Sequence, residues 1–186
     1  QASYPGLLTE GIEILAIYVM PLVFADAMRA LEALLGLPQT SGEVALTGAG
    51  LGGSLALFTA SRRPQIRAVA SDTPLMLGNA EILEQAAAYP LAELQDYLRV
   101  NPQRRDNILA NTAVMNLLEM APRISVPVLL GLGDKDRGQC PINLGRLLAE
   151  RISNCDLRVY QGAGEGGGHE HHLVRTGWLK ERLGVD

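Results

Sequence analysis

A glycine-dense turn is the feature of this sequence with the clearest chemical meaning. Gly48, Gly50 and Gly53 follow an apolar run at residues 43–47 and precede a second apolar stretch. The spacing Gly-x-Gly-x-x-Gly is typical of turns that bind the pyrophosphate of a dinucleotide. Gly48 and Gly52 also match the outer glycines of Gly-x-Ser-x-Gly, a turn that presents a nucleophilic serine. Gly50 stands in the position of that serine, so this second motif lacks its hydroxyl group.

Two later loops carry the other residue types that a serine hydrolase needs. Asp134 follows an apolar run at residues 126–131, with Asp136 just beyond it, and His169 follows a glycine-rich loop at residues 162–168. Nucleophile turn, acid and histidine is the chain order of α/β-hydrolase triads, in which the acid orients the histidine that takes the nucleophile's proton. The order predicts Asp134 as the acid and His169 as the base, and leaves Asp136 as an alternative acid.

The dinucleotide interpretation uses a different acid. Asp72 ends the second apolar run after Gly48, near the spacing of roughly 20 residues expected of an acid that binds ribose hydroxyls. This interpretation leaves the later acid and histidine loops unexplained. The alternative without a catalytic role for the histidine run at 169–172 is a solvated helix start or weak adventitious metal binding.

The elements that would position these residues alternate between strand and helix. Strands are predicted at residues 43–47, 66–70, 126–131 and 157–160, and helices from Tyr18 to about 35, at 51–61, at 141–152 and from His169 to about 183. Residues 79–120 are predicted to be a helical insertion. Such alternation predicts a three-layer α/β/α fold with a mostly parallel sheet, formed by a single domain over residues 1–186. The glycine turn, Asp134 and His169 would then meet at the carboxyl ends of the strands, where ligands bind.

The composition excludes several classes of function. The chain has 186 residues, a net charge of −4 and no basic block, so nucleic acid is not an expected partner. No run of about 18 apolar residues is present, which argues against a membrane span. Cys140 and Cys155 are too few for a disulfide framework or a zinc site. Two free cysteines predict a reducing, cytoplasmic location, and no metal is expected.

An ordered set of runs resembles the acetyl xylan esterase / cephalosporin C deacetylase family. The runs are residues 26–32, 43–57, 121–124, 126–134, 140–141, 159–160 and 168–170, so the resemblance extends from about Tyr18 to the C-terminus. It implies an α/β-hydrolase fold, a Ser-His-Asp triad, removal of acetyl groups from short xylo-oligosaccharides or cephalosporin C, no cofactor, and a cytoplasmic oligomer. Matched by position, Asp134 would be the acid, His169 the base and the Leu51 N–H an oxyanion donor.

Two departures from the family shape the expected function. Gly50 replaces the serine, and no acyl-enzyme can form through glycine. The first strands of the family precede the matched region, so we expect an α/β-hydrolase fold that lacks its N-terminal strands and has a bare sheet edge.

The sequence therefore predicts a carboxylic-ester hydrolase-like protein, inactive or impaired at Gly50, whose partner is a small acetylated ligand. A homo-oligomer or a missing N-terminal segment would cover the bare edge. A non-catalytic binding or interaction module is the alternative, and an NAD(P)-binding domain is the third.

Overall fold

A parallel four-stranded sheet forms the centre of the computed structural model, which describes residues 20–38, 40, 42–76, 78, 80–85 and 91–185. The strands are β1 (Ala45–Ala49), β2 (Ala68–Asp72), β3 (Val128–Gly133) and β4 (Cys155–Tyr160), in the order β1-β2-β3-β4. Ala49 is paired with Asp72, and Asp72 with Gly131. The carboxyl ends of these three strands therefore lie side by side at the same end of the sheet.

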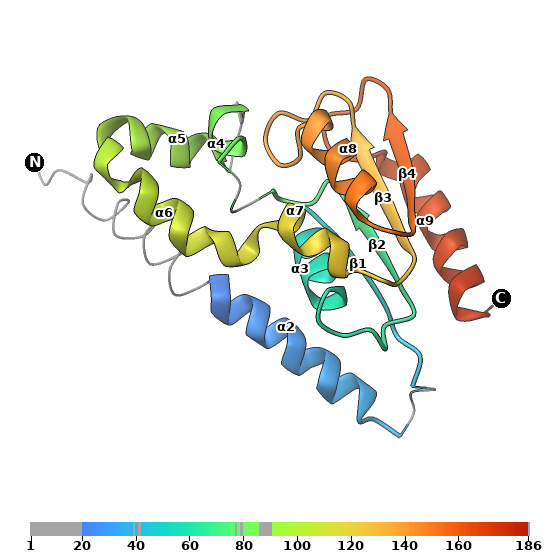
Figure 1. Cartoon of the computed structure of the whole chain (residues 1–186). Helices are drawn as coiled ribbons and strands as arrows, with labels where there is room; N and C mark the ends of the chain where they lie inside the picture. Colours follow the sequence, from blue (N-terminus) through green and yellow to red (C-terminus); the bar gives the residue numbers. More distant parts are fainter. Residues whose placement is uncertain are drawn as a thin grey trace, which may run out of the picture.

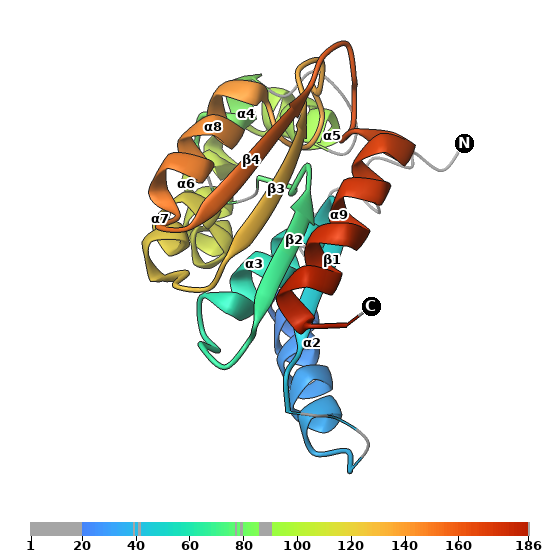
Figure 2. The same ribbon diagram turned by 90° about the vertical axis from the view of Figure 1, so that its right-hand side faces the viewer.

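Helices cover both faces of this sheet (Figures 1 and 2). Helices α3 (Leu51–Ala60) and α8 (Ile142–Arg151) lie on one face, and α9 (Gly168–Leu183) lies on the other. The arrangement confirms the predicted three-layer α/β/α fold with a parallel sheet. In the part of the chain that the structure describes, β1 is paired on one side only, with β2.

Helix α2 (Met20–Leu35) packs beside α3 (Figure 1). The rings of Phe24 and Phe58 meet edge to face, with centroids 4.2 Å apart and planes at 71°. Tyr18, where the sequence predicted this helix to begin, lies outside the described residues. The contact attaches α2 to the same layer as α3.

Short helices connect β2 to β3, in the region where the sequence predicted helices only. They are α4 (Ile82–Gln85), α5 (Leu91–Val100), η2 (Pro102–Arg104), α6 (Arg105–Thr112), η3 (Ala113–Met115), α7 (Leu117–Met120) and η4 (Ala121–Arg123). Residues 79 and 86–90 of the predicted insertion lie outside the described ranges. In Figure 1, α5 and α6 project away from the sheet, whereas α7 lies against the layer of α3 and α8.

The first three strands begin and end about two residues later than the sequence predicted. The apolar residues used to place their starts, Val44, Ile66 and Val126, are buried but precede the paired segments. Pairing continues beyond the apolar runs, to Asp72 in β2 and Gly133 in β3. An apolar run predicts that residues are buried, not that they are paired in a sheet. The residues that lead into these strands are buried as well as the paired residues, so the apolar runs begin too early.

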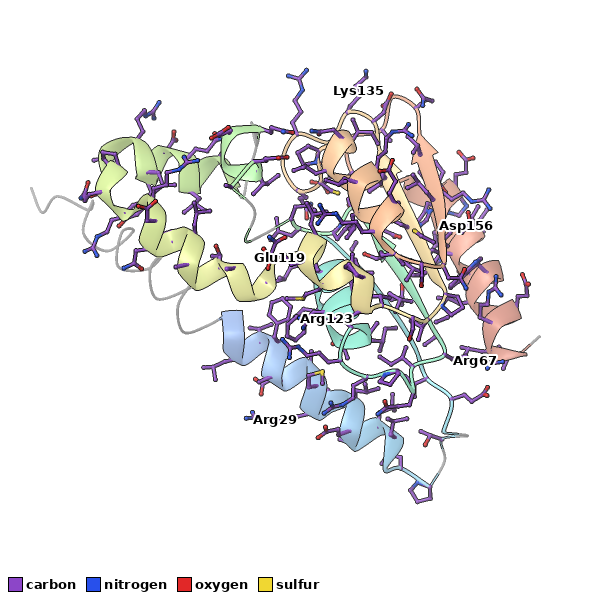
Figure 3. The ribbon with its side chains drawn as sticks, in the orientation of Figure 1. Arg29, Arg67, Glu119, Arg123, Lys135 and Asp156 are labelled. Atoms are coloured by element: carbon purple, nitrogen blue, oxygen red, sulfur yellow. The ribbon has the colours of Figure 1, made fainter. Side chains whose placement is uncertain are left out.

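Labelled side chains mark the two ends of the sheet in Figure 3. Lys135, the second residue after β3, lies at the carboxyl end. Arg67 directly precedes β2 at the opposite end, where its Nε donates to the carbonyl oxygen of Arg182 in α9 (3.2 Å). No helix within the described ranges is long and apolar enough to cross a membrane.

Gly48→Ala is expected to destabilise the fold, because β1 and α3 approach each other closely at this position. A Cβ atom on Gly48 would lie 2.5 Å from the carbonyl oxygen of Gly52 and 2.8 Å from the nitrogen of Gly53. Backbone atoms cannot move aside as a side chain would, so we expect a loss of about 2–3 kcal/mol in the free energy of unfolding, measured by urea denaturation. Gly52→Ala is the matched control, because a Cβ there meets nothing within 4 Å. An equal loss in both variants would contradict this account.

Candidate active site

Gly50 lies at the apex of the turn between β1 and α3. Its φ of 55° and ψ of −123° cost a residue with a Cβ atom about 1–3 kcal/mol. The Gly50 N–H donates to the carbonyl oxygen of Asp72 (3.0 Å), and its own carbonyl oxygen accepts from the N–H groups of Ser54 and Leu75 (3.1 Å each). The backbone thus has the sharp strand-to-helix form of a nucleophile elbow, without a side chain at its apex.

A cavity of about 390 Å³ opens beside this turn. It is lined by Ala49, Gly50, Leu51, Asp72, Thr73, Gln139, Glu165, Gly166, Gly167 and Gly168. The lining comes from the carboxyl end of the sheet, the usual ligand position in parallel sheets. Leu51 begins α3, and the first N–H groups of a helix have no acceptor within it. Its N–H can therefore serve a ligand here, and its oxyanion role stays a prediction.

The side chain of Gln139 occupies the space in front of Gly50. A Cβ atom on Gly50 would overlap its Oε1 and lie 3.3 Å from its Cδ. The backbone of Gln139 is fixed, because its N–H donates to Asp136 (3.0 Å) and its carbonyl oxygen accepts from the N–H of Met76 (3.0 Å). The amide at the end of the Gln139 side chain therefore lies in the space that a nucleophile's side chain would enter, and it would have to shift to make room.

Asp136, the alternative acid, is used within its own loop. Its Oδ1 accepts from the N–H groups of Gly138 (2.9 Å) and Gln139 (3.0 Å), and its Oδ2 accepts from that of Cys140 (3.1 Å). The residue is 8% exposed. Its carboxylate closes the turn before α8 and so places Gln139 against Gly50.

Asp134 and His169 are not joined to each other. Asp134 Oδ1 accepts from the N–H of Gly162 (2.6 Å), and its Oδ2 lies 3.9 Å from the ammonium group of Lys135. His169 is exposed, and its ring stacks on that of His172 at a centroid distance of 6.4 Å. No hydrogen bond links Asp134 to His169 within the described residues, and neither residue lines the cavity. Their triad roles stay predictions.

A different histidine is buried beneath the site. His171 is 1% exposed, with its Nε2 at 2.5 Å from Asp72 Oδ1 and its Nδ1 at 2.6 Å from the hydroxyl of Tyr160. Arg175, one turn further along α9, donates to Asp72 Oδ2 (2.7 Å). Burial, followed by the charge of Glu170, raises the pKa of Tyr160, so its hydroxyl keeps its proton at neutral pH.

The buried His171 explains the direction of His169. Successive residues of an α-helix are about 100° apart around the axis, so residues two positions apart point to nearly opposite sides. Because α9 turns His171 toward the sheet, it turns His169 toward solvent. The sequence analysis placed both residues in one histidine run and assigned the base to His169, which stays a prediction. The four-residue spacing of His171 and Arg175 is the signal that could have found the buried cluster.

A match to a protein-family model shows the family of the chain. The model for acetyl xylan esterase (AXE1) matches residues 1–181. The chain belongs to the acetyl xylan esterase family. The acetyl esterase Axe7A of Xylanibacter ruminicola is 29% identical over 138 residues, which cover 73% of this chain and 30% of the relative. The resemblance found in the sequence motifs is thereby confirmed.

Two solved members of the acetyl xylan esterase family share the fold. The enzyme from Thermoanaerobacterium sp. JW/SL YS485 superposes with a TM-score of 0.81 at 21% identity, over 98% of this chain and 59% of that one. The enzyme from Paenibacillus sp. R4 superposes with a TM-score of 0.78 at 21% identity, over 86% of this chain and 52% of that one. The chain therefore spans little more than half the length of these structures, and less than a third of Axe7A.

Several cavity residues had no role in the prediction from sequence. Thr73 has a φ of 36°, the one positive φ of a non-glycine residue among those described, and Glu165 and Gln139 also line the cavity. Positive φ depends on tertiary contacts and leaves no trace in residue order. Across the described ranges, no group of three or more His, Cys, Asp or Glu side chains is placed to hold a metal ion.

Gly131→Ala is expected to destabilise the protein through His171. A Cβ atom on Gly131 would lie 2.5 Å from Cε1 and 2.6 Å from Nε2 of that ring. We expect a loss of about 2–4 kcal/mol in urea denaturation, since the ring is held on both sides and cannot withdraw. In the double variant with His171→Ala, the two losses should fall short of additivity by at least about 1 kcal/mol. Strict additivity would show that the ring is not the obstacle.

The two cysteines should react slowly with thiol reagents in the folded protein. Burial, followed by the charge of Asp136, raises the pKa of Cys140 well above its usual range. Burial, followed by the charge of Asp156, raises the pKa of Cys155 to about 12. Because the thiolate is the reactive form, labelling by an aromatic disulfide at pH 8 should be at least tenfold faster in urea than in buffer. Rapid labelling of native protein would reveal a reactive thiol.

Proposed function

We propose that this chain binds small acetylated sugars or related esters in the cavity beside Gly50, and that it hydrolyses them little or not at all. The observation that carries the proposal is the elbow itself, which keeps its backbone form with glycine at the apex. An acyl-enzyme needs a nucleophilic oxygen or sulfur at this position, and glycine supplies neither.

The described surroundings of Gly50 supply no substitute nucleophile. Among the residues that the structure describes, no serine, cysteine or histidine lines the cavity, and its hydroxyl comes from Thr73. No hydrogen bond joins Thr73 to an imidazole in the described part of the chain. Ser54, in the first turn of α3, is 2% exposed and donates its hydroxyl to the carbonyl oxygen of Leu75 (2.8 Å). It is therefore committed to structure.

Binding is supported by what the cavity retains. The Leu51 N–H and the Gln139 amide offer hydrogen-bond donors, while the Glu165 and Asp72 carboxylates offer acceptors. A concave site with a few convergent polar groups is the usual form of a small-molecule site. The family of the chain and its acetyl esterase relative make an acetylated ligand the class to test first.

Hydrolysis of an aryl acetate tests the catalytic half of the proposal. The chain as given should match the buffer background and show no burst, because no acyl-enzyme forms. Gly50→Ser should gain less than about tenfold, since Gln139 fills the space for the new hydroxyl and no imidazole contacts it. Gly50→Ser/His169→Ala is the control. Hydrolysis above background by the chain as given would overturn this half. Strong activity in the single variant that vanishes in the double variant would make His169 a competent base and overturn the obstruction assigned to Gln139.

Thermal unfolding tests the binding half. A ligand that binds the folded state at 100 times its dissociation constant adds about 2.7 kcal/mol to the free energy of unfolding. A monoacetylated methyl xyloside at millimolar concentration should therefore raise the Tm by several degrees, while unacetylated methyl xyloside should act more weakly. The absence of a shift with any acetylated sugar would overturn the binding proposal.

A further inference from the structure

The carboxylate of Asp72 is held in one orientation at the wall of the cavity. Its Oδ1 lies 2.5 Å from His171 Nε2, and its Oδ2 accepts from Arg175 at 2.7 Å. The side chain is 12% exposed, and Asp72 lines the cavity beside Gly50. A carboxylate has about four acceptor directions. The two contacts use one direction on each oxygen and leave a second on each.

The structure commits several residues to this one carboxylate. His171 is anchored in turn by Tyr160 at its other ring nitrogen (2.6 Å), and the absence of a side chain at Gly131 makes room for its ring. A buried carboxylate is costly unless it is paired and hydrogen-bonded. An apolar residue at position 72 would avoid the cost of burying a carboxylate. The presence of Asp72 therefore points to a use for the acceptor directions that His171 and Arg175 leave over.

The charges around Asp72 define what can bind there. Arg175 balances the charge of Asp72, so this carboxylate by itself offers little net attraction to a cation. Glu165 lines the same cavity and disfavours an anion. A neutral molecule with adjacent O–H donors suits two neighbouring carboxylate oxygens, and adjacent hydroxyl groups of this kind are characteristic of sugar rings.

We propose that Asp72 recognises the sugar part of the ligand, by accepting hydrogen bonds from two adjacent hydroxyl groups of a neutral ring while His171 and Arg175 hold its carboxylate in place. The inference rests on the proposed function and deepens it. Because the acceptor is oriented before the ligand arrives, little ordering is needed on binding. Asp72 is then the residue that separates sugar esters from simple esters.

Two matched esters test this role in the unmodified full chain. Monoacetylated methyl xyloside carries ring hydroxyls, and cyclohexyl acetate carries none. By calorimetric titration the chain should bind the xyloside at least tenfold more tightly, because a site built for hydroxyls is left unpaired by the analogue. Asp72→Asn should lower the xyloside affinity at least tenfold and leave cyclohexyl acetate unchanged, since a hydrogen bond to a charged group is lost.

Asp156→Asn is the matched control for the change of an aspartate to its amide. Asp156, labelled in Figure 3, lies on β4, where it pairs with Arg158 (2.8 Å). It does not line the cavity. Both affinities should stay unchanged in this variant. A selective loss here equal to that of Asp72→Asn would show that overall charge, rather than Asp72, governs the affinity.

Arg175→Met is a second variant that tests the role of Asp72 if Asp72→Asn does not fold. It leaves the carboxylate but removes one of its two holders, so the xyloside affinity should fall severalfold while that of cyclohexyl acetate holds. Circular dichroism establishes that each titrated variant is folded. An equal fall for both esters, or no fall for either, would overturn the role of Asp72.

The outcomes separate this inference from the proposed function. If the unmodified chain binds both esters equally, acetyl-ester binding stands and the role of Asp72 falls. If it binds neither ester, the proposed function is wrong, and the role of Asp72, which rests on it, is wrong as well. NAD⁺ is the third ligand, because ribose also offers adjacent hydroxyls. Preference for NAD⁺, lost in Asp72→Asn, would transfer the same chemistry to a nucleotide and overturn the assignment to an acetylated sugar.

Discussion

The contact between His171 and Asp72 is the constraint on which the rest of the site depends. It joins α9 to the carboxyl end of β2 across Gly131, so the His171 ring fits against this face only because β3 has no side chain at that position. Removing His171 would leave Asp72 with Arg175 alone, and removing Asp72 would leave the buried His171 ring with Tyr160 alone. Together with the buried Trp178, this pair fixes which face of α9 turns toward the sheet.

Losing the nucleophile and keeping the elbow are physically compatible. A side chain at Gly50 would hold the backbone in an unfavourable region and would compete with Gln139 for space, whereas glycine adopts the same φ at little cost. The backbone hydrogen bonds of the turn need no side chain at position 50. A residue with a Cβ atom would store strain at this position, and glycine avoids that strain.

The fold could be predicted from the sequence because it depends on periodic burial. The strand, turn and helix around Gly50 and the parallel order of the sheet follow from apolar runs separated by glycine and aspartate. The site could be predicted only as a set of residues that lie together at the carboxyl ends of the strands. Whether Asp136 faces a ligand or its own loop depends on three backbone N–H groups. Residue order does not reveal such contacts.

The histidine run shows why position along the chain is a poor guide to a site on a helix. His169 and His171 differ by two positions, and this half turn of helix separates a solvated ring from a buried one. A loop at this point would leave either residue free to face the cavity. Because α9 begins at Gly168, the helix allows only one of them to face the sheet, and the acid at the end of β2 selects His171. The arrangement therefore fixes the carboxylate of Asp72 beside the cavity and leaves the ring of His169 exposed to solvent.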